Sequence, residues 1–367
     1  MSEWRKTTWG EVATLEYGKA LRAYGNGTGD VRVYGTNGPV GWTDIRQAEG
    51  PGVIIGRKGA YRGVHYSPKD FWVIDTAFYL RPVESINLRW AYYALVNQDI
   101  NSLDSGSAIP STSRADFYAL SVAIPPLAEQ DAIVEVLGAL DDKIEINERV
   151  ATTAEDLTLV ISSAERWQDR VRLDEVCLLR KDQVTPRDIT EAVVDHYSLP
   201  AFDARRTPER VSPETIKSGK FSVMEPAVLL SKLNPNIPRV WNVAPASGVP
   251  SLASTEFLVL SPRGAVTTHE LWAVTRQQPF LDGLASRVTG TSKSHQRVRP
   301  AEVMEAEVVD PRQFGETGAQ IRSLCGRAAL ARRESQTLIT LRDTLLPQLM
   351  SGRIRVKDAE KIVEDAT

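Results

Sequence analysis

The chain has 367 residues and contains the same succession of segments twice, which restricts it to folds built from two similar units. Residues 53–59 (Val-Ile-Ile-Gly-Arg-Lys-Gly) correspond to residues 228–234 (Val-Leu-Leu-Ser-Lys-Leu-Asn). Residues 75–82 correspond to residues 254–262, with one additional residue in the second copy. A period of this length indicates a duplicated domain and not a solenoid of short repeats.

Each copy ends in a long segment with the heptad spacing of a coiled coil. Core-type positions recur at alternating intervals of four and three residues from Ile133 to Ile161, and with one break from Ile321 to Leu349. Residues 125–169 carry 3 basic and 11 acidic side chains, whereas residues 321–349 carry five arginines, so charge also favours pairing. We therefore predict two long helices in an antiparallel coiled coil. Its predicted seam residues are Leu137, Leu140, Ile144, Asn147, Leu324, Leu338 and Leu345.

Asn147 is the polar member of this seam, and the sequence leaves two interpretations open. A buried Asn can fix the register of a coiled coil by pairing across the helices. Alternatively, the seam drifts around the helix and leaves Asn147 exposed to solvent. The spacing alone favours neither interpretation.

The segments before the long helices predict two small α+β domains. Short β-branched and aromatic runs lie between Gly, Pro and Asp clusters, which is typical of strands. Residues 24–41 are predicted to be loops, and helices are expected at about residues 88–102 and 270–284. The predicted domains are residues 1–124, 125–169 (central helix), 170–311 and 312–367 (C-terminal helix and tail). The fold class is α+β, with two globular domains joined by two long helices that form an antiparallel coiled coil, and with a pseudo-two-fold internal repeat.

The charge distribution does not point directly to a partner. The formal net charge is −3, and the acid excess lies in the first long helix. Residues 1–124 carry 13 basic and 12 acidic side chains, and residues 170–311 carry 18 and 17. Any basic surface must therefore arise from folding, which can gather Arg and Lys on one face.

Other features of the sequence predict a cytoplasmic location. No apolar run approaches the roughly 18 residues of a membrane span, and the first residues lack the apolar core of a signal peptide. The two cysteines, Cys177 and Cys325, lie far apart in the sequence. They are expected to be reduced, buried thiols and not a disulfide framework.

Motifs of catalysis and metal binding are weak. The sequence has no phosphate-binding GxxxxGK[ST] loop. Asn234-Pro-Asn-Ile departs from the Asn-Pro-Pro-aromatic signature of amino-methyltransferases at two positions, and a turn is the favoured interpretation. Asp141-Asp-Lys143 has the residue types of a nuclease site but falls on the predicted helix, where a solvated face is expected. The four His and two Cys show no metal-ligand spacing, so we predict no metal site and no active site.

Two pairs of loops combine cations with small polar residues at matched positions in the two copies. Residues 56–62 form a Gly-flanked turn with counterpart 231–239, and residues 105–114 are a run of small hydroxyls with counterpart 289–297. Arg and Lys can bind phosphates or the O6/N7 edge of guanine, which favours DNA contact; solvated turns and flexible polar loops are the alternative. The candidate DNA-binding residues are Arg57, Lys58, Tyr61, Arg62, Ser111, Thr112, Ser113, Arg114, Lys232, Asn234, Arg239, Thr291, Ser292, Lys293, His295 and Arg297.

The order of these segments resembles the DNA-specificity subunit of type I restriction-modification systems, over essentially the whole chain. The resemblance is carried by residues 106–117, 124–130 (Ile-Pro-Pro-Leu-Ala-Glu-Gln), 231–239 and 341–354. It implies two target-recognition domains that each read one half of a split, asymmetric DNA site, and two helices that set the gap. The second copy departs from the pattern at residues 309–315 (Val-Asp-Pro-Arg-Gln-Phe-Gly), which leaves docking on that side open to different contacts.

The resemblance also implies which partners and cofactors to expect. The chain itself would be non-catalytic and would hold no cofactor. Its partners would be double-stranded DNA and two copies of a methylation subunit, which binds S-adenosylmethionine and methylates adenine N6 after flipping the base. A restriction subunit that translocates DNA is a further partner that the resemblance leaves open. No membrane partner is expected.

Two other classes of function compete with this interpretation. A stand-alone DNA methyltransferase or nuclease with a degenerate motif would be active without partners and would lose its activity on the substitution Asn234→Ala. A structural coiled-coil adaptor would not bind DNA. Tight, salt-sensitive DNA binding by the assembled complex would therefore argue against the adaptor.

Overall fold

The chain divides into two compact units, each built around its own sheets and its own share of two long helices. The computed structural model describes residues 4–25, 27–103, 110–163, 165–246, 248–287 and 296–366. Unit 1 comprises Met1–Ile144 and Thr337–Thr367, and unit 2 comprises Glu145–Gln336. The helices α4 (Leu127–Ser162) and α10 (Glu316–Met350) each begin in one unit and end in the other. The four domains predicted from the sequence are not tested by this division and stay a prediction.

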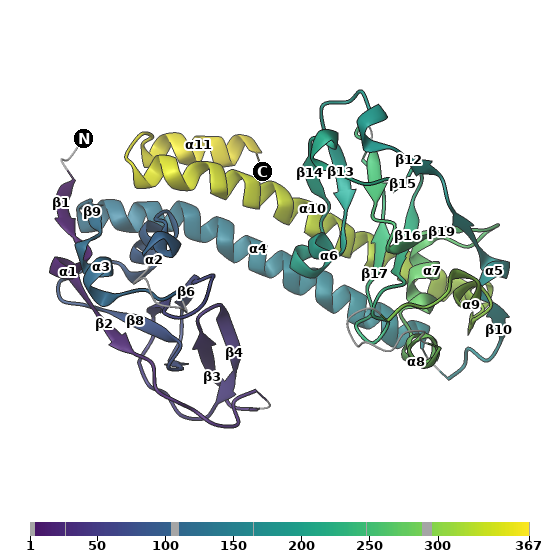
Figure 1. The fold of residues 1–367 in the computed structure, drawn as a ribbon, viewed down its shortest axis with the longest axis horizontal. Coiled ribbons are helices and arrows are strands. Elements are labelled where there is room, and N and C mark those ends of the chain that lie inside the picture. Colours follow the sequence, from purple (N-terminus) through teal and green to yellow (C-terminus); the bar gives the residue numbers. More distant parts are fainter. Residues whose placement is uncertain are drawn as a thin grey trace. The chain divides into compact units, whose positions relative to one another are not determined.

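Unit 1 is an α+β unit with a four-stranded antiparallel sheet and a smaller mixed sheet (Figure 1). The larger sheet has the order β2 (Ala13–Tyr17), β8 (Ala77–Pro82), β5 (Gly52–Gly56), β6 (Val64–Ser67). The smaller has the order β4 (Gly38–Thr43), β3 (Val31–Gly35), β7 (Phe71–Val73), with β3 and β7 parallel. The remaining elements are β1 (Arg5–Thr8) paired with β9 (Ser121–Ile124), α1 (Trp9–Val12), α2 (Leu88–Val96), η1 (Ile100–Ser102), α3 (Arg114–Ala119) and α11 (Val356–Ala366).

Unit 2 has the same plan with a larger second sheet (Figure 1). Its four-stranded sheet has the order β11 (Cys177–Arg180), β19 (Phe257–Pro262), β16 (Ala227–Ser231), β17 (Val240–Val243). Its second sheet has the order β12 (Gln183–Val184), β15 (Lys220–Ser222), β18 (Ser251–Ala253), β13 (Val194–Tyr197), β14 (Glu209–Val211). The remaining elements are β10 (Arg170–Arg172) paired with β20 (Glu307–Val309), α5 (Leu173–Val176), η2 (Pro186–Asp188), α6 (Leu199–Arg205), η3 (Pro213–Thr215), α7 (Thr268–Thr275), α8 (Gln278–Ser286), α9 (Pro300–Met304) and η4 (Pro311–Phe314).

The internal repeat predicted from the sequence is confirmed at the level of strand order and register. The strands β2, β8, β5 and β6 of unit 1 correspond in order to β11, β19, β16 and β17 of unit 2. Ile54 pairs with Tyr79 in unit 1, and at the matched place Leu229 pairs with Val259 in unit 2. Each second sheet also contains one parallel pair, β3 with β7 and β13 with β18. The α+β class and the duplicated plan therefore hold in three dimensions.

Three local predictions were wrong. Residues 24–41 were expected to be loops, but β3 and β4 form a hairpin there, because Val33 and Tyr34 are buried and Gly38, at φ +110°, permits the turn. The helix expected at residues 88–102 ends at Val96 and is followed by a short 3-10 turn. The helix expected at residues 270–284 is two helices, because Pro279 lies in the first turn of α8 and cannot extend α7.

In each unit, one capped helix covers the larger sheet. Asn87 precedes α2, and its side chain accepts hydrogen bonds from the backbone N–H groups of Arg89 and Trp90. Thr267 forms a capping box with Glu270 at the start of α7. Both helices bury a Trp, Trp90 and Trp272, in the core of their own unit. Each helix thus packs against one face of its sheet. The loops that join the strands lie at the ends of the strands.

The two long helices pack as an antiparallel coiled coil, which confirms that part of the predicted fold. In unit 1, the Arg342 guanidinium donates to Asp141 over 2.8 Å. In unit 2, Thr158 lies beside Cys325, their Oγ1 and Sγ atoms 3.9 Å apart. The contacts of later residues of α4 are thus with earlier residues of α10, as in an antiparallel pair. Among the described residues, no helix is both long and apolar enough to cross a membrane.

The predicted seam residues lie where the two helices meet. Asn147 is only 4% exposed, and its Nδ2 donates to the Glu334 carboxylate over 2.9 Å. It therefore makes a buried contact across the helices and is not exposed to solvent. Ile144 and Leu324 are partly buried at the margins of their clusters. The fully buried apolar seam residues are Leu137, Leu140, Leu338 and Leu345, all in unit 1.

Candidate nucleic-acid interface

In unit 1, the two predicted DNA-contacting segments are held together by backbone hydrogen bonds. The loop after β5 and the segment before α3 meet in a bridge between Lys58 and Ser111. The Thr112 N–H donates to the Arg57 carbonyl over 2.9 Å, and the Gly59 N–H donates to the Pro110 carbonyl over 3.0 Å. Segments about 50 residues apart in the sequence therefore form one continuous surface.

Unit 2 repeats this loop pairing at the matched positions. Its bridge joins Leu233 and Arg297. The Val298 N–H donates to the Lys232 carbonyl over 3.0 Å, and the Asn234 N–H donates to the Gln296 carbonyl over 2.8 Å. Asn234 takes the place of Gly59, and both have positive φ, +50° and +120°. Gly and Asn are the residues that adopt this conformation most readily, so the Asn234 segment is a structural turn.

An aromatic residue that the sequence did not single out joins the surface of unit 1. Tyr17 ends β2 and is 44% exposed. The Arg114 guanidinium lies over its ring at 4.4 Å from the centroid, and the Arg57 guanidinium lies over it at 4.9 Å. The two arginines are 57 residues apart, and Tyr17 is far from both in the sequence. The single sequence signal is an aromatic residue at the end of a strand, which is too common to identify a site.

Two of the predicted contacts in unit 1 have structural roles. Arg62 is only 2% exposed, and its guanidinium donates to the backbone carbonyls of Asn101, Leu103 and Gly59. Those carbonyls draw the side chain inward, where it braces the loop, and its predicted DNA contact stays a prediction. Thr112 is also buried and donates through Oγ1 to the Gly56 carbonyl.

The other candidates in unit 1 remain accessible. Tyr61 is 65% exposed, and Lys58 and Arg114 are exposed. Ser113 caps α3, since its Oγ accepts from the backbone N–H groups of Ala115 and Asp116. Ser111 is half-buried beside Lys58 in the bridge. The accessible set therefore combines cations, one aromatic side chain and hydroxyls on a single loop pair.

In unit 2, the candidate arginines are paired with carboxylates. Arg239 donates to both oxygens of Asp203, over 2.6 and 2.7 Å, and is 13% exposed. Arg297 donates to both oxygens of Glu256, which raises the pKa of Arg297. Lys232 is half-buried. Four further candidates lie outside the described residues: Thr291, Ser292, Lys293 and His295.

The residues that resemble catalytic motifs have structural roles. Asp141 accepts from the Tyr93 hydroxyl over 2.6 Å and from Arg342, and Asp142 accepts from Arg89 over 2.6 Å. Burial raises the pKa of the thiols of Cys177 and Cys325 to about 12, so neither is a nucleophile near neutral pH. Within the described ranges, no group of three or more His, Cys, Asp or Glu side chains could hold a metal ion.

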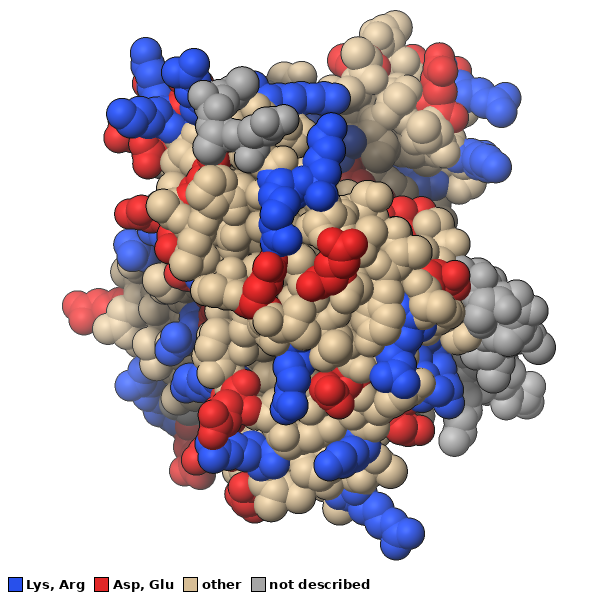
Figure 2. Space-filling view, turned by 90° about the vertical axis from the view of Figure 1, so that its left-hand side faces the viewer, with Lys and Arg blue, Asp and Glu red and all other residues tan. Residues whose placement is uncertain are grey.

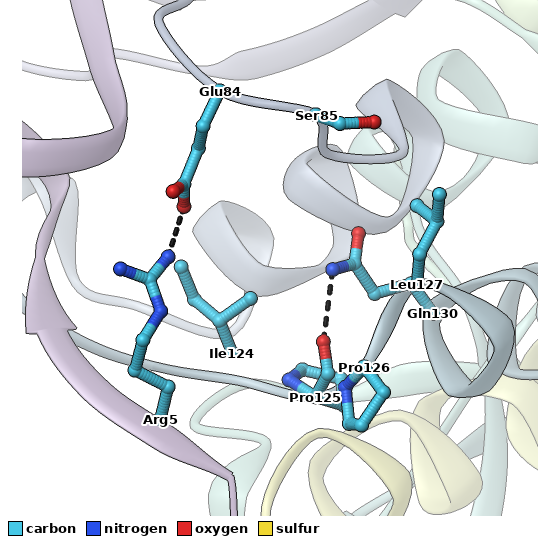
Figure 3. Close-up of a pocket in the computed structure, with 8 residues that line it drawn as sticks. All are labelled: Arg5, Glu84, Ser85, Ile124, Pro125, Pro126, Leu127 and Gln130. Atoms are coloured by element: carbon cyan, nitrogen blue, oxygen red, sulfur yellow. Dashed lines mark hydrogen bonds and ion pairs between the residues drawn. The ribbon is translucent and has the colours of Figure 1, made fainter.

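One open hollow of about 590 Å³ lies in unit 1 at the start of α4 (Figure 3). Arg5 and Glu84 form an ion pair on one side, and the Gln130 amide donates to the Pro125 carbonyl over 2.9 Å on the other. Two pairs of polar groups in the lining of this hollow thus bind each other. Its lining residues are Arg5, Glu84, Ser85, Ile124, Pro125, Pro126, Leu127 and Gln130.

The charge on the surface is mixed. Figure 2 shows one face of the molecule, on which Lys and Arg are interspersed with Asp and Glu across a largely uncharged surface. This face fits the near balance of basic and acidic side chains in the sequence. Local clusters of cations, such as the loop pair of unit 1, are therefore candidates for anion binding.

Comparison with known proteins finds similarity to proteins of one kind. Residues 1–155 match the family model described as type I restriction modification DNA specificity domain. The type I restriction enzyme EcoprrI specificity subunit of Escherichia coli is 26% identical over 145 residues, which cover 38% of this chain and 36% of that protein. A Haemophilus influenzae protein designated as a type I restriction enzyme specificity subunit is 26% identical over 117 residues, covering 31% and 30%. The matched segment thus spans about a third of these relatives.

The fold as a whole also has a solved counterpart. The crystal structure of a type I restriction-modification S subunit from M. genitalium aligns with 94% of this chain and 96% of its own, with a TM-score of 0.59. The sequence identity over this alignment is 17%. The likeness therefore concerns the fold, and it extends over both units.

Proposed function

We propose that this chain, whose residues 1–155 match the family model of the type I restriction modification DNA specificity domain, is the DNA-reading subunit of such a system. Each unit reads one half of a split, asymmetric DNA site. The observation that carries the proposal is the loop pairing that occurs in both units on equivalent strands, with different side chains in each. Equal scaffolds with unequal loops suit a reader of two unlike half-sites.

The loop pairs offer the two kinds of contact that DNA recognition needs. Arg, Lys and Ser side chains bind phosphate oxygens, which set the position of a protein on the duplex. Arg and Asn can also read base edges in the major groove, and a good bidentate contact contributes about 1–3 kcal/mol of discrimination. The candidates for these roles are Arg57, Lys58, Tyr61, Ser111, Ser113 and Arg114 in unit 1, and Lys232, Asn234, Arg239, Lys293 and Arg297 in unit 2.

The chemistry of the system belongs to partner subunits. The chain docks two methylation subunits, which bind S-adenosylmethionine and methylate adenine N6 after flipping the base out of the duplex. It holds no cofactor itself and determines the DNA site at which methylation takes place. The two long helices set the gap between the half-sites, so one added heptad in each should change the gap and leave the half-sites unchanged.

Reconstitution from purified components tests this proposal. The chain alone should neither methylate nor cleave DNA, whereas the chain with its methylation subunit and S-adenosylmethionine should methylate one bipartite motif. Methylation by the chain alone, abolished by Asn234→Ala, would establish the stand-alone enzyme instead. A complex that binds DNA no better with the chain than without it would support an adaptor without DNA binding.

A further inference from the structure

Three side chains from three separate segments form one cluster on unit 1. Tyr17 ends β2, Arg57 follows β5, and Arg114 begins α3. Both guanidinium groups lie within 5 Å of the centroid of the Tyr17 ring. The Tyr17 ring itself packs against Phe78 of the adjacent strand β8, with ring centroids 5.0 Å apart. The exposed ring is thus held in place by its contact with the sheet.

Each guanidinium has a second restraint besides the ring. Nη1 of Arg57 donates to the Asp75 carbonyl over 3.0 Å, and Nη1 of Arg114 donates to the Leu15 carbonyl over 3.3 Å. A guanidinium has five N–H donors, so most donors of each remain for a ligand. Stacking and one fixed hydrogen bond hold each fork in place and reduce the side-chain entropy that a bound anion would cost.

The charge of the cluster is uncompensated within the part of the chain that the structure describes. Neither Arg57 nor Arg114 forms an ion pair with a described carboxylate, whereas Arg239 and Arg297 of unit 2 each have one. Two like charges held beside one ring repel each other, and a neighbouring anion removes that cost. A phosphodiester group has the charge and the acceptor oxygens that two guanidinium forks can bind together.

We propose that Arg57 and Arg114 form a DNA phosphate clamp that seats unit 1 on the duplex backbone, with Tyr17 as the positioning residue that holds both arginines. This inference rests on the proposed function and deepens it. The clamp sets the position of unit 1 beside its half-site, and the sequence of the half-site is read by other side chains. Tyr17 acts through the arginines and does not itself need to touch DNA.

The salt dependence of DNA binding by the assembled complex tests the clamp. The probes are a duplex with the recognised site, a duplex with an altered first half-site, and a duplex with neither half-site. Each lost phosphate contact reduces the slope of log K against log salt by about 0.9. Arg57→Ala and Arg114→Ala should each do so and weaken binding to all three duplexes by similar factors. Arg81→Ala, which removes an exposed cation at the other end of the same sheet, is the matched control and should leave the slope unchanged.

Substitution of Tyr17 tests its positioning role without a change in charge. Tyr17→Phe keeps the ring and should bind like the wild type, whereas Tyr17→Leu removes the ring and should weaken binding about as much as either arginine substitution. Thermal unfolding of both variants controls for loss of fold. Equal affinity of Tyr17→Leu and the wild type would overturn the positioning role.

Other outcomes separate the clamp from the proposed function. Unchanged salt slopes in a complex that still methylates its bipartite site would refute the clamp alone. Loss of discrimination at a single base pair would assign the arginines to base reading and also refute it. Weaker assembly of the complex without DNA would identify an acidic protein segment as the ligand. Absence of any bipartite site in the wild-type complex would refute the proposed function itself.

Discussion

The two units share one backbone plan but hold their candidate arginines in opposite ways. In unit 1, Arg57 and Arg114 lie on the exposed ring of Tyr17. In unit 2, Arg239 and Arg297 are held by Asp203 and Glu256. Strand pairing places Glu16 and Arg180 at matched positions, so Lys181 takes the place of Tyr17. The paired arginines of unit 2 also stand at other positions, since the matched bridges place Arg297 where unit 1 has Ser111.

This contrast shows which part of the site the fold determines. The backbone hydrogen bonds of the loop pair are the same in both units and do not depend on side-chain identity. The side chains on that scaffold are free to differ, and so are the groups that orient them. A duplicated unit of this kind can acquire two specificities without any change in its strand order.

The buried seam between the long helices also differs between the two units. In unit 1, the buried seam is made of leucines, among them Leu140 and Leu338. In unit 2, its middle part consists of Ala151, Ala154, Ala328 and Ala331, and Ile321 and Cys325 are buried nearer the start of α10. Small side chains allow close approach of two helices but bury less apolar surface. The helix pair is therefore expected to contribute more to the stability of unit 1 than to that of unit 2.

The largest expected effect tests this seam contrast. Leu140→Ala should destabilise unit 1 by about 2–5 kcal/mol, because it removes buried surface and leaves a cavity. Ala154→Gly at the alanine seam should cost unit 2 only about 1 kcal/mol, mainly through helix propensity. Amide hydrogen exchange of β5 and β16 reports the stability of each unit. Equal losses of protection in the two strands would contradict the contrast.

A smaller effect is expected from the release of a paired arginine. Asp203→Asn removes the bidentate partner of Arg239 and leaves its charge uncompensated. Affinity for DNA without the recognised site should rise roughly two- to five-fold, in line with the small contribution of surface ion pairs. Asp30→Asn is the matched control, because it removes one exposed acid of unit 1 without releasing an arginine. A fluorescence titration in which both variants bind equally would refute the role assigned to Asp203.

The smallest effect concerns pH. Burial lowers the pKa of His65 in unit 1 and of His196 and His269 in unit 2. Each histidine therefore takes up its proton more readily in the unfolded chain than in the folded one. The stability that each contributes is complete above the unfolded pKa of about 6.5 and is lost as pH falls from there toward the folded pKa.

Two such histidines lie in unit 2 and one in unit 1, so acid should weaken unit 2 more. Amide hydrogen exchange at about pH 7.5 and about pH 5.5, on either side of the unfolded histidine pKa, compares the two units directly. The difference between them should shrink when His196 and His269 are both replaced by Gln. A greater acid sensitivity of β5 than of β16 would contradict this expectation.

Much of the fold could be predicted because it depends on local periodicity. The heptad spacing that includes Leu137 and Leu338 predicted the helix pair, since a repeated apolar position defines a helix face whatever it packs against. The duplication was visible because equivalent strands keep their apolar pattern. The hairpin of β3 and β4 was missed, because its Gly and Asn residues indicate turns and hide a strand in which Val33 and Tyr34 are buried.

The candidate site was predictable only as a set of loops. The sequence presents Arg57, Lys58 and Arg62 as equivalent cations, yet carbonyl groups about 40 residues away bury Arg62. Tyr17 could not be identified, because its significance depends on two arginines from other segments. Pairing of Arg239 with Asp203 is likewise decided by the helix α6, which the loop sequence does not contain.

A map of methylated adenines in host DNA, with this gene intact and with it deleted, shows whether this chain directs methylation to a bipartite site. Single-molecule sequencing detects these positions whatever the motif in which they lie. Deletion should remove methylation from one asymmetric motif made of two separated halves. Deletion that leaves every methylated motif in place, or that removes an uninterrupted one, would contradict this role.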